Sequence, residues 1–221
     1  MRRYLERVLP AGGSVSRRVR ITQAGEMCQK PGGRWVRFSA VEELAVEEVA
    51  FSWRARFPIA PLVSLRVVDR YAASEGLLEA RLLRLVPVMR ARGQEAAEGQ
   101  ALRYLSELAW VPQAMFANRQ LVWRELDGQT VEVATRAGST RVALRLEFDA
   151  AGDVVGTWAN ARPRIEGKKT VPRQWVGVFG DYGVVGGIRL PTRGEARWEL
   201  PEGPFTYWRG RITSLELDPS I

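Results

Sequence analysis

Histidine is absent from this sequence of 221 residues, and cysteine occurs once. Without histidine the chain cannot form a Ser–His or Cys–His nucleophile pair, and it lacks the side chain that titrates closest to neutral pH. Ordinary zinc and copper sites also lose their usual nitrogen ligands. We therefore expect a protein that is not an enzyme, with no catalytic residue, no metal and no cofactor. The single Cys28 excludes an internal disulfide and is expected to be a small buried hydrophobe.

Long apolar runs are missing as well. No stretch of about 18 apolar residues is present, so we expect no membrane-spanning helix. The N-terminal residues MRRYLERVLPAGG begin with basic side chains, but Pro10 follows too soon for the apolar core of a signal peptide. We expect a cytoplasmic protein, with peripheral association with the cell envelope left open. Since no linker rich in serine, glycine or proline divides the chain, a single domain over residues 1–221 is expected.

Positive charge is concentrated near the N-terminus. The formal net charge is +8, and residues 1–38 carry nine basic against two acidic side chains. This predicts a basic face with Arg17, Arg18 and Arg20, which suits an anionic membrane surface. Residues 42–48 are rich in glutamate and can neutralise this face, so a merely solvated surface is the alternative. Nucleic acid is the disfavoured partner, because most tryptophans fall on the apolar parity of strand-like segments.

Alternation of apolar and polar residues dominates the rest of the chain. The alternating segments are residues 18–22, 51–57, 78–82, 142–148, 195–200 and 208–212. A period of two is typical of antiparallel strands with one dry and one wet face. Turn residues such as Asp127-Gly128 and Gly186-Gly187 separate these segments, which indicates a long meander.

Two segments lack this period and define the expected fold class. Residues 3–9 suit a short amphipathic helix, and residues 95–115 follow helical spacing with a kink at Pro112. We expect an α+β, mostly β fold: a single curved antiparallel sheet, a half-barrel meander, covered on its concave face by the N-terminal helix and the kinked mid-chain helix. The expected parts are an N-terminal helix and linker (1–14), a first strand set (15–92), a lid helix (93–118) and a second strand set (119–218).

The glycine-rich residues 180–187, GDYGVVGG, raise the question of a phosphate-binding loop. Such a loop follows a strand and opens a helix, because the helix N-terminus supplies the amides that hold the anion. Here Gly186-Gly187 leads into another alternating segment. The sequence therefore predicts a hairpin at these glycines.

Six short phrases resemble an uncharacterised bacterial family that is known only as a domain of unknown function. They are Arg3-Tyr4-Leu5, Phe51-x-Trp53-x-Ala55, Arg103-Tyr104-Leu105-x-Glu107 with Trp110-x-Pro112, Phe179-Gly180-Asp181-Tyr182, Pro191-Thr192-x-Gly194 and Tyr207-Trp208-Arg209-Gly210. That family has no established activity. The order of elements over residues 15–218 also resembles the LolA/LolB-like lipoprotein-localisation factors, which implies a half-barrel with helices over its concave face.

A binding protein is the function that this architecture favours. An open half-barrel with a helical lid has difficulty filling its own interior, and an apolar molecule is the natural occupant. We expect a lipid-like or other hydrophobic ligand between the sheet and the lid helix. The residues predicted to line its apolar cavity are Phe51, Trp53, Phe57, Leu105, Leu108, Trp110, Met115 and Trp198. A packed core without a cavity is the alternative for each of them.

A carboxylate-based enzyme is a further alternative. It would use a polar cluster of Arg103, Glu107, Asp181 and Tyr182. Paired carboxylates can act as acid and base when their surroundings separate their pKa values. An ion pair between the lid helix and the sheet is the simpler interpretation of these residues.

Overall fold

The computed structural model describes residues 1–9, 15–167 and 169–218. The helices are α1 (Arg2–Val8), α2 (Gln94–Ser106), the 3₁₀ helix η1 (Glu107–Ala109) and α3 (Ala114–Ala117). The strands are β1 (Arg18–Met27), β2 (Val36–Ala45), β3 (Phe51–Ala60), β4 (Val63–Ala72), β5 (Glu75–Leu82), β6 (Val86–Arg92), β7 (Val122–Glu125), β8 (Thr130–Ala137), β9 (Thr140–Phe148), β10 (Val154–Glu166), β11 (Lys169–Val185), β12 (Ile188–Leu200) and β13 (Gly203–Leu217). Within this described part of the chain, each helix is too short or too polar to cross a bilayer.

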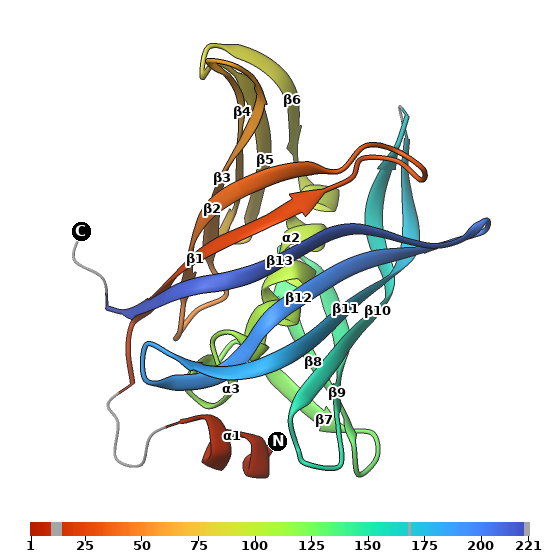
Figure 1. Cartoon of the computed structure of the whole chain (residues 1–221). Helices are drawn as coiled ribbons and strands as arrows, with labels where there is room; N and C mark the ends of the chain where they lie inside the picture. Colours follow the sequence, from red (N-terminus) through yellow and green to blue (C-terminus); the bar gives the residue numbers. More distant parts are fainter. Residues whose placement is uncertain (10–14, 168, 219–221) are drawn as a thin grey trace.

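All these strands belong to one curved antiparallel sheet (Figure 1). The strands β1 to β6 form one meander and β7 to β13 form another, and the two meanders join where β1 pairs with β13. In this pairing Val19 lies opposite Leu217, and Met27 lies opposite Trp208. The first and last strands therefore lie in the middle of the sheet, and β6 and β7 form its edges. The predicted half-barrel is confirmed.

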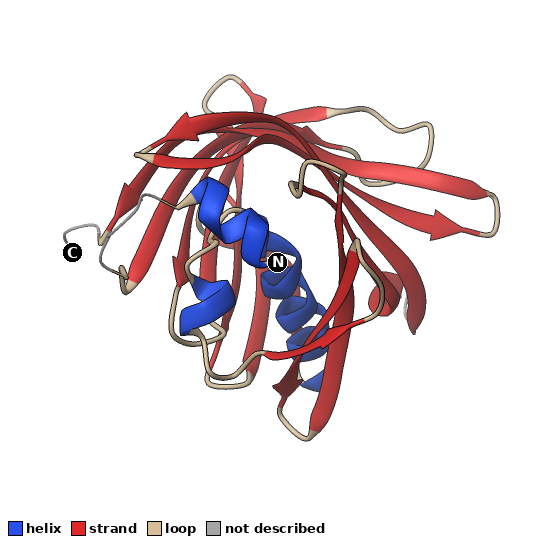
Figure 2. Ribbon diagram, turned by 90° about the horizontal axis from the view of Figure 1, so that it is seen from below, coloured by secondary structure: helices blue, strands red, loops and turns tan. Residues whose placement is uncertain are grey.

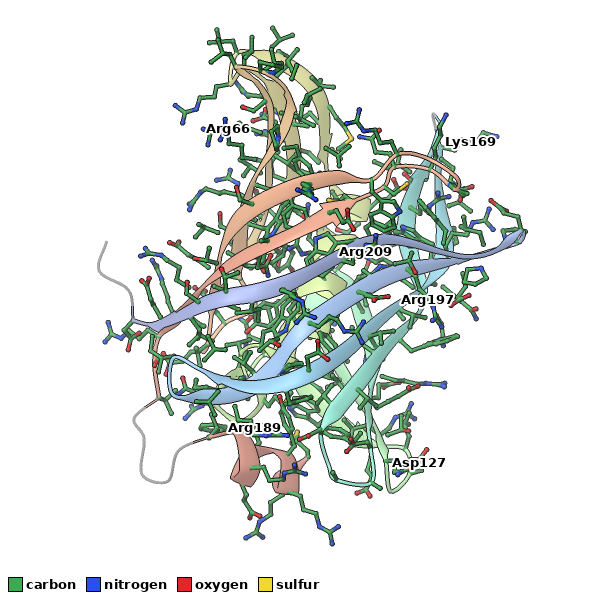
Figure 3. The ribbon with its side chains drawn as sticks, viewed as in Figure 1. Arg66, Asp127, Lys169, Arg189, Arg197 and Arg209 are labelled. Atoms are coloured by element: carbon green, nitrogen blue, oxygen red, sulfur yellow. The ribbon has the colours of Figure 1, made fainter. Side chains whose placement is uncertain are left out.

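Burial follows the alternation of the sequence. In β3 the residues 51, 53, 55 and 57 are buried, whereas Arg54 and Arg56 are exposed. Charged side chains cover the convex face, where Arg197 of β12 and Arg209 of β13 lie in front of their strands (Figure 3). The wet face and the dry face are thus the convex and concave sides of one sheet.

The lid consists of α2, η1 and α3, which lie inside the curve of the sheet (Figure 2). α2 contacts β4, β5 and β6 of the first strand set and β8, β9 and β10 of the second. Its buried side chains include Ala97, Ala101, Tyr104 and Leu105. The helix ends before Pro112, and the short α3 follows that proline. This confirms the predicted kinked helix on the concave face.

The N-terminal helix α1 lies at one end of the molecule, which is the lower end in Figure 1. Its Tyr4 and Val8 are buried, and the Tyr4 hydroxyl donates a hydrogen bond of 3.0 Å to the carbonyl of Ala109 in η1. Two helices that are far apart in sequence are therefore joined directly. The linker predicted up to residue 14 lies partly outside the described residues, which omit positions 10–14.

The predicted glycine hairpin is confirmed. Gly186 and Gly187 connect β11 to β12 with φ angles of +58° and +80°. Glycine adopts this left-handed region at no steric cost. A β-strand follows the turn, so the arrangement lacks the helix N-terminus that a phosphate loop requires.

Candidate functional site

An arginine in the last turn of α2 connects the lid to the first strand set. Arg103 forms three ion pairs of 2.8 Å: Nη2 with Glu42 of β2, Nη1 with Asp69 of β4, and Nε with Glu107 one helical turn away. The three carboxylates surround one guanidinium, which offers its donors in a planar fork. The position that a bound cation would need is therefore occupied by Arg103 itself.

Hydrogen bonds from two glutamine side chains hold Glu42 and Asp69 in place. Gln23 of β1 donates to Glu42 over 2.8 Å and accepts a bond of 2.9 Å from the indole nitrogen of Trp53. Gln100 donates to Asp69 over 2.6 Å. The Arg103 guanidinium also lies 4.9 Å and 5.0 Å from the ring centres of Phe51 and Trp53, within the range of a cation–π contact.

Burial and neighbouring charges shift the pKa of Glu42 in this cluster. Burial raises the pKa of Glu42 well above its usual range, and the neighbouring Glu107 carboxylate raises it further, while Arg103 lowers it. One oxygen of Glu107 is buried without a hydrogen-bond partner among the described residues. The cluster thus fixes the position of the lid on the sheet, at the desolvation cost of burying four charged side chains.

Sequence reasoning found Arg103 and Glu107 but not their partners on the sheet. The alternation of buried and exposed residues in β2 is the signal that could have identified Glu42. Glu42 lies on the buried face of β2 between Ala40 and Leu44, and it is fully buried. A charged residue at a position where apolar residues alternate requires a buried counter-charge.

Above this polar cluster the concave face of β3 to β6 is an apolar wall. Residues directly opposite each other on neighbouring strands share a face and form a row across the sheet. Trp53 and Asp69 are opposite each other and both contact Arg103, so their row faces α2. The next two rows are Ala55, Val67, Ala80 and Met89, and then Phe57, Leu65 and Leu82. The wall is most exposed at the β6 edge: exposure is 3% at Ala55 and 5% at Ala80 but 40% at Met89.

A small cavity lies at the base of this apolar wall. It has a volume of about 120 Å³ and lies between β4–β6, the first turns of α2 and the β10–β11 hairpin. Its lining combines Asp69 and Gln100 with apolar side chains such as Leu78 and Ile165. Pockets for small-molecule ligands usually measure about 300–1,000 Å³. The cavity therefore has room for one end of a ligand, and a longer molecule would extend along the wall.

The eight residues predicted to line an apolar cavity are all buried, each with less than a tenth of its surface exposed. Most of them lie under or within the lid, where Trp53 and Phe51 contact Arg103 and Leu105 and Leu108 are fully covered. Phe57 is the member that belongs to the apolar wall. None of the eight lines the cavity at the base of the wall.

The four residues of the predicted polar cluster do not come together. Arg103 and Glu107 are paired in the lid. The Tyr182 hydroxyl donates to the carbonyl of Val154 over 2.8 Å, whereas the neighbouring Asp181 pairs with Arg211 at 2.8 Å and is half exposed. Successive strand residues point to opposite faces, so Asp181 and Tyr182 serve different parts of the molecule.

The predicted basic face is only partly available. Arg17 and Arg18 are exposed. Arg20 is engaged with Glu43 of β2 at 3.0 Å and with Glu216 of β13 at 3.4 Å. Glutamates on the strands that flank β1 therefore neutralise part of this face, as the solvated-surface alternative requires.

Residues 1–210 match the model of the family of unknown function DUF6544. The chain belongs to this family. The predicted membership of a family without established activity is thereby confirmed, and no curated protein matches the DUF6544 chain.

Several solved structures align with most of this DUF6544 protein. One is a domain from Vibrio parahaemolyticus described as outer-membrane lipoprotein-sorting, with 11% identity, a TM-score of 0.48, and 92% of this chain and 86% of that chain covered. A DUF1329 family protein from Desulfovibrio piger has 11% identity and a TM-score of 0.48, with 94% and 88% covered. A LolA superfamily protein from Nitrosomonas europaea has 10% identity and a TM-score of 0.46, with 100% and 92% covered.

Proposed function

We propose that this DUF6544 protein is a non-enzymatic binding protein, which holds a lipid-like or other hydrophobic molecule on the concave apolar wall of β3 to β6. The observation that carries the proposal is the wall itself. Val67 and Leu65 remain half-buried, and Met89 is 40% exposed, although all three face the side that the lid covers lower down. Apolar surface on a concave face is stabilised when an apolar ligand removes it from water.

The size of the cavity fixes how the ligand would lie. Its volume of about 120 Å³ accommodates a small polar or branched end, where Asp69 and Gln100 offer hydrogen-bonding groups. The apolar remainder would lie along the wall above α2, over Val67 and Leu65. Catalysis finds little support here, because Glu42, Asp69 and Glu107 are all bonded to Arg103.

A matched pair of valines on β4 tests the proposal. Val67 faces the concave side and its neighbour Val68 the convex side, and both are half-buried. We expect Val67→Gln to weaken binding of a fluorescent long-chain fatty acid about tenfold, because one buried aliphatic side chain is worth about 1.5–3 kcal/mol. Val68→Gln should change binding less than about twofold, since its side chain does not reach the wall. Fluorescence titration gives both affinities.

Two further measurements complete this experiment. Met89→Gln lies on the same wall at an exposed position, so it should weaken binding without changing the unfolding transition. Native mass spectrometry of protein purified without detergent should reveal a bound apolar molecule. Absence of binding by the unmodified protein, or equal losses for Val67→Gln and Val68→Gln, would contradict the proposal.

A further inference from the structure

The hairpin turns at the far end of β3–β6 expose large apolar side chains. Leu62, in the β3–β4 turn, is 98% exposed, and Leu85, in the β5–β6 turn, is 78% exposed. Ile59, Leu83 and Val86 in the same two turns or the adjoining strand ends are between 48% and 56% exposed. We call these five residues the apolar tip. Figure 1 shows the turns together at the end of the strands that project beyond the rest of the sheet.

The two turns form one rigid feature. The amide of Leu83 donates a hydrogen bond of 3.0 Å to the carbonyl of Ser64 at the start of β4. The amide of Leu85 bonds the carbonyl of Leu82 over 3.0 Å and closes its own turn. Ladder pairing of β4 with β5 continues up to Leu65 opposite Leu82. The exposed leucines are therefore held at fixed positions beside each other.

These turns carry leucine and arginine at positions with positive φ angles, which glycine and asparagine adopt more easily. Leu62, Leu83 and Arg84 have φ angles of +62°, +51° and +66°. Hairpin turns with positive φ favour asparagine and glycine, because a Cβ atom is crowded in that region. Since the local conformation does not favour these side chains, their chemistry at the surface is the better reason for their presence.

The charge around the apolar tip has one sign. Residues 56–66 and 81–90 contain five arginines and no acidic residue. Arg81 and Arg90 approach Glu79 at 3.0 Å and 3.8 Å. Arg56 and Arg84 are exposed and make no ion pair within the described part of the chain. An apolar tip flanked by arginines without ion pairs complements a layered surface whose outer layer is anionic and whose interior is apolar.

We propose that the apolar tip docks on an anionic phospholipid bilayer, with its leucines in the interfacial layer and Arg56 and Arg84 at the lipid phosphates. Arginine side chains can keep their charge at the headgroups while an apolar neighbour enters the bilayer. A protein partner is less well matched, because single leucines on the apices of turns offer little area for a flat interface. This docking does not depend on a ligand being bound to the concave wall.

Vesicle co-sedimentation with the full chain tests the docking. We expect binding to vesicles of phosphatidylglycerol and phosphatidylcholine in equal parts, weaker binding to phosphatidylcholine alone, and a further loss at high salt. The double variant Leu62→Ser with Leu85→Ser should bind the anionic vesicles at least about tenfold less. Both leucines are exposed, so the variant should fold normally. Arg84→Gln should weaken binding to the anionic vesicles alone.

Two controls make the outcome decisive. Val122 and Val184 are 61% and 73% exposed but lie on other strands, so Val122→Ser with Val184→Ser should leave vesicle binding unchanged. Replacing Arg17 and Arg18 by glutamine should also leave it unchanged, which separates the tip from the N-terminal basic residues. The proposal is overturned if the unmodified protein does not sediment with anionic vesicles, if the leucine variant binds normally, or if the Arg17 and Arg18 variant alone loses binding.

Discussion

Replacing Arg103 by methionine is expected to lower the free energy of unfolding by about 3–5 kcal/mol at neutral pH. The change leaves Glu42, Asp69 and Glu107 without the guanidinium that each of them contacts at 2.8 Å. All three carboxylates are nearly or fully buried, and a buried charge without a partner is far more costly than a buried pair is stabilising. Chemical denaturation monitored by tryptophan fluorescence measures the loss.

The same loss should shrink at lower pH. Burial already holds the folded-state pKa of Glu42 above its usual value, and removal of Arg103, whose charge lowers that pKa, raises it further. A group with a raised folded pKa contributes its full stability below the unfolded pKa and loses it as the pH rises through the folded pKa. The difference between the unmodified protein and Arg103→Met should therefore be smaller at mildly acidic pH than at neutral pH. A difference that does not change with pH would contradict a buried charge cluster.

Two companion variants separate charge from packing. Arg2→Met removes an exposed arginine that pairs with the exposed Glu6, and it should change stability by less than about 0.5 kcal/mol. Combining Arg103→Met with Glu42→Gln and Glu107→Gln should recover part of the loss, because neutral side chains no longer need a counter-charge. If the combined variant is less stable than Arg103→Met alone, the carboxylates are not the source of the cost.

Only the helical half of this cluster could be predicted from the sequence. The sequence placed Arg103 and Glu107 in one polar cluster, and the structure pairs them one helical turn apart. Their partner Asp69 lies 34 positions before Arg103 in the chain. Which strand faces the helix depends on the order of strands in the sheet, and local alternation contains no information about that order.

The same limit applies to the sheet as a whole. Alternation located the strands and their dry faces, as in residues 51–57 of β3. The join between β1 and β13 depends on two segments almost 200 residues apart, such as Val19 and Leu217. Asp181 and Tyr182 cannot both face the lid, because neighbouring strand residues point to opposite sides, and the Tyr182 hydroxyl bonds the carbonyl of Val154 instead. Exposed leucines in tight turns were not anticipated, since turn chemistry favours other residues.

Replacing Trp110 by alanine is the second change with a large expected effect, about 3–5 kcal/mol of unfolding free energy. Trp110 follows η1 and is only 4% exposed. Its indole nitrogen donates a hydrogen bond of 3.0 Å to the carbonyl of Pro191 on β12, and its ring meets Phe179 edge to face with centroids 5.5 Å apart. Alanine leaves a cavity and an unpaired carbonyl, and thermal or chemical denaturation measures the result.

Trp158 provides a control of the same residue type. It is half-buried, and its indole nitrogen bonds the side chain of the exposed Asn160. Trp158→Ala should cost markedly less, on the order of 1 kcal/mol, because little packing and no buried hydrogen bond is lost. Equal costs for the two tryptophans would mean that Trp110 does not anchor the lid.

Gly194 supplies a sharper test of the same contact. A Cβ atom at this position would lie 2.8 Å from Cζ2 and 3.2 Å from Cη2 of Trp110, so Gly194→Ala should cost about 1–3 kcal/mol by overpacking. In a chain that already carries Trp110→Ala this clash disappears, and the added methyl fills part of the cavity. The double variant should therefore be more stable than the sum of the two single losses predicts, by about 1 kcal/mol or more. Strict additivity would show that the lid and β12 do not meet at this glycine.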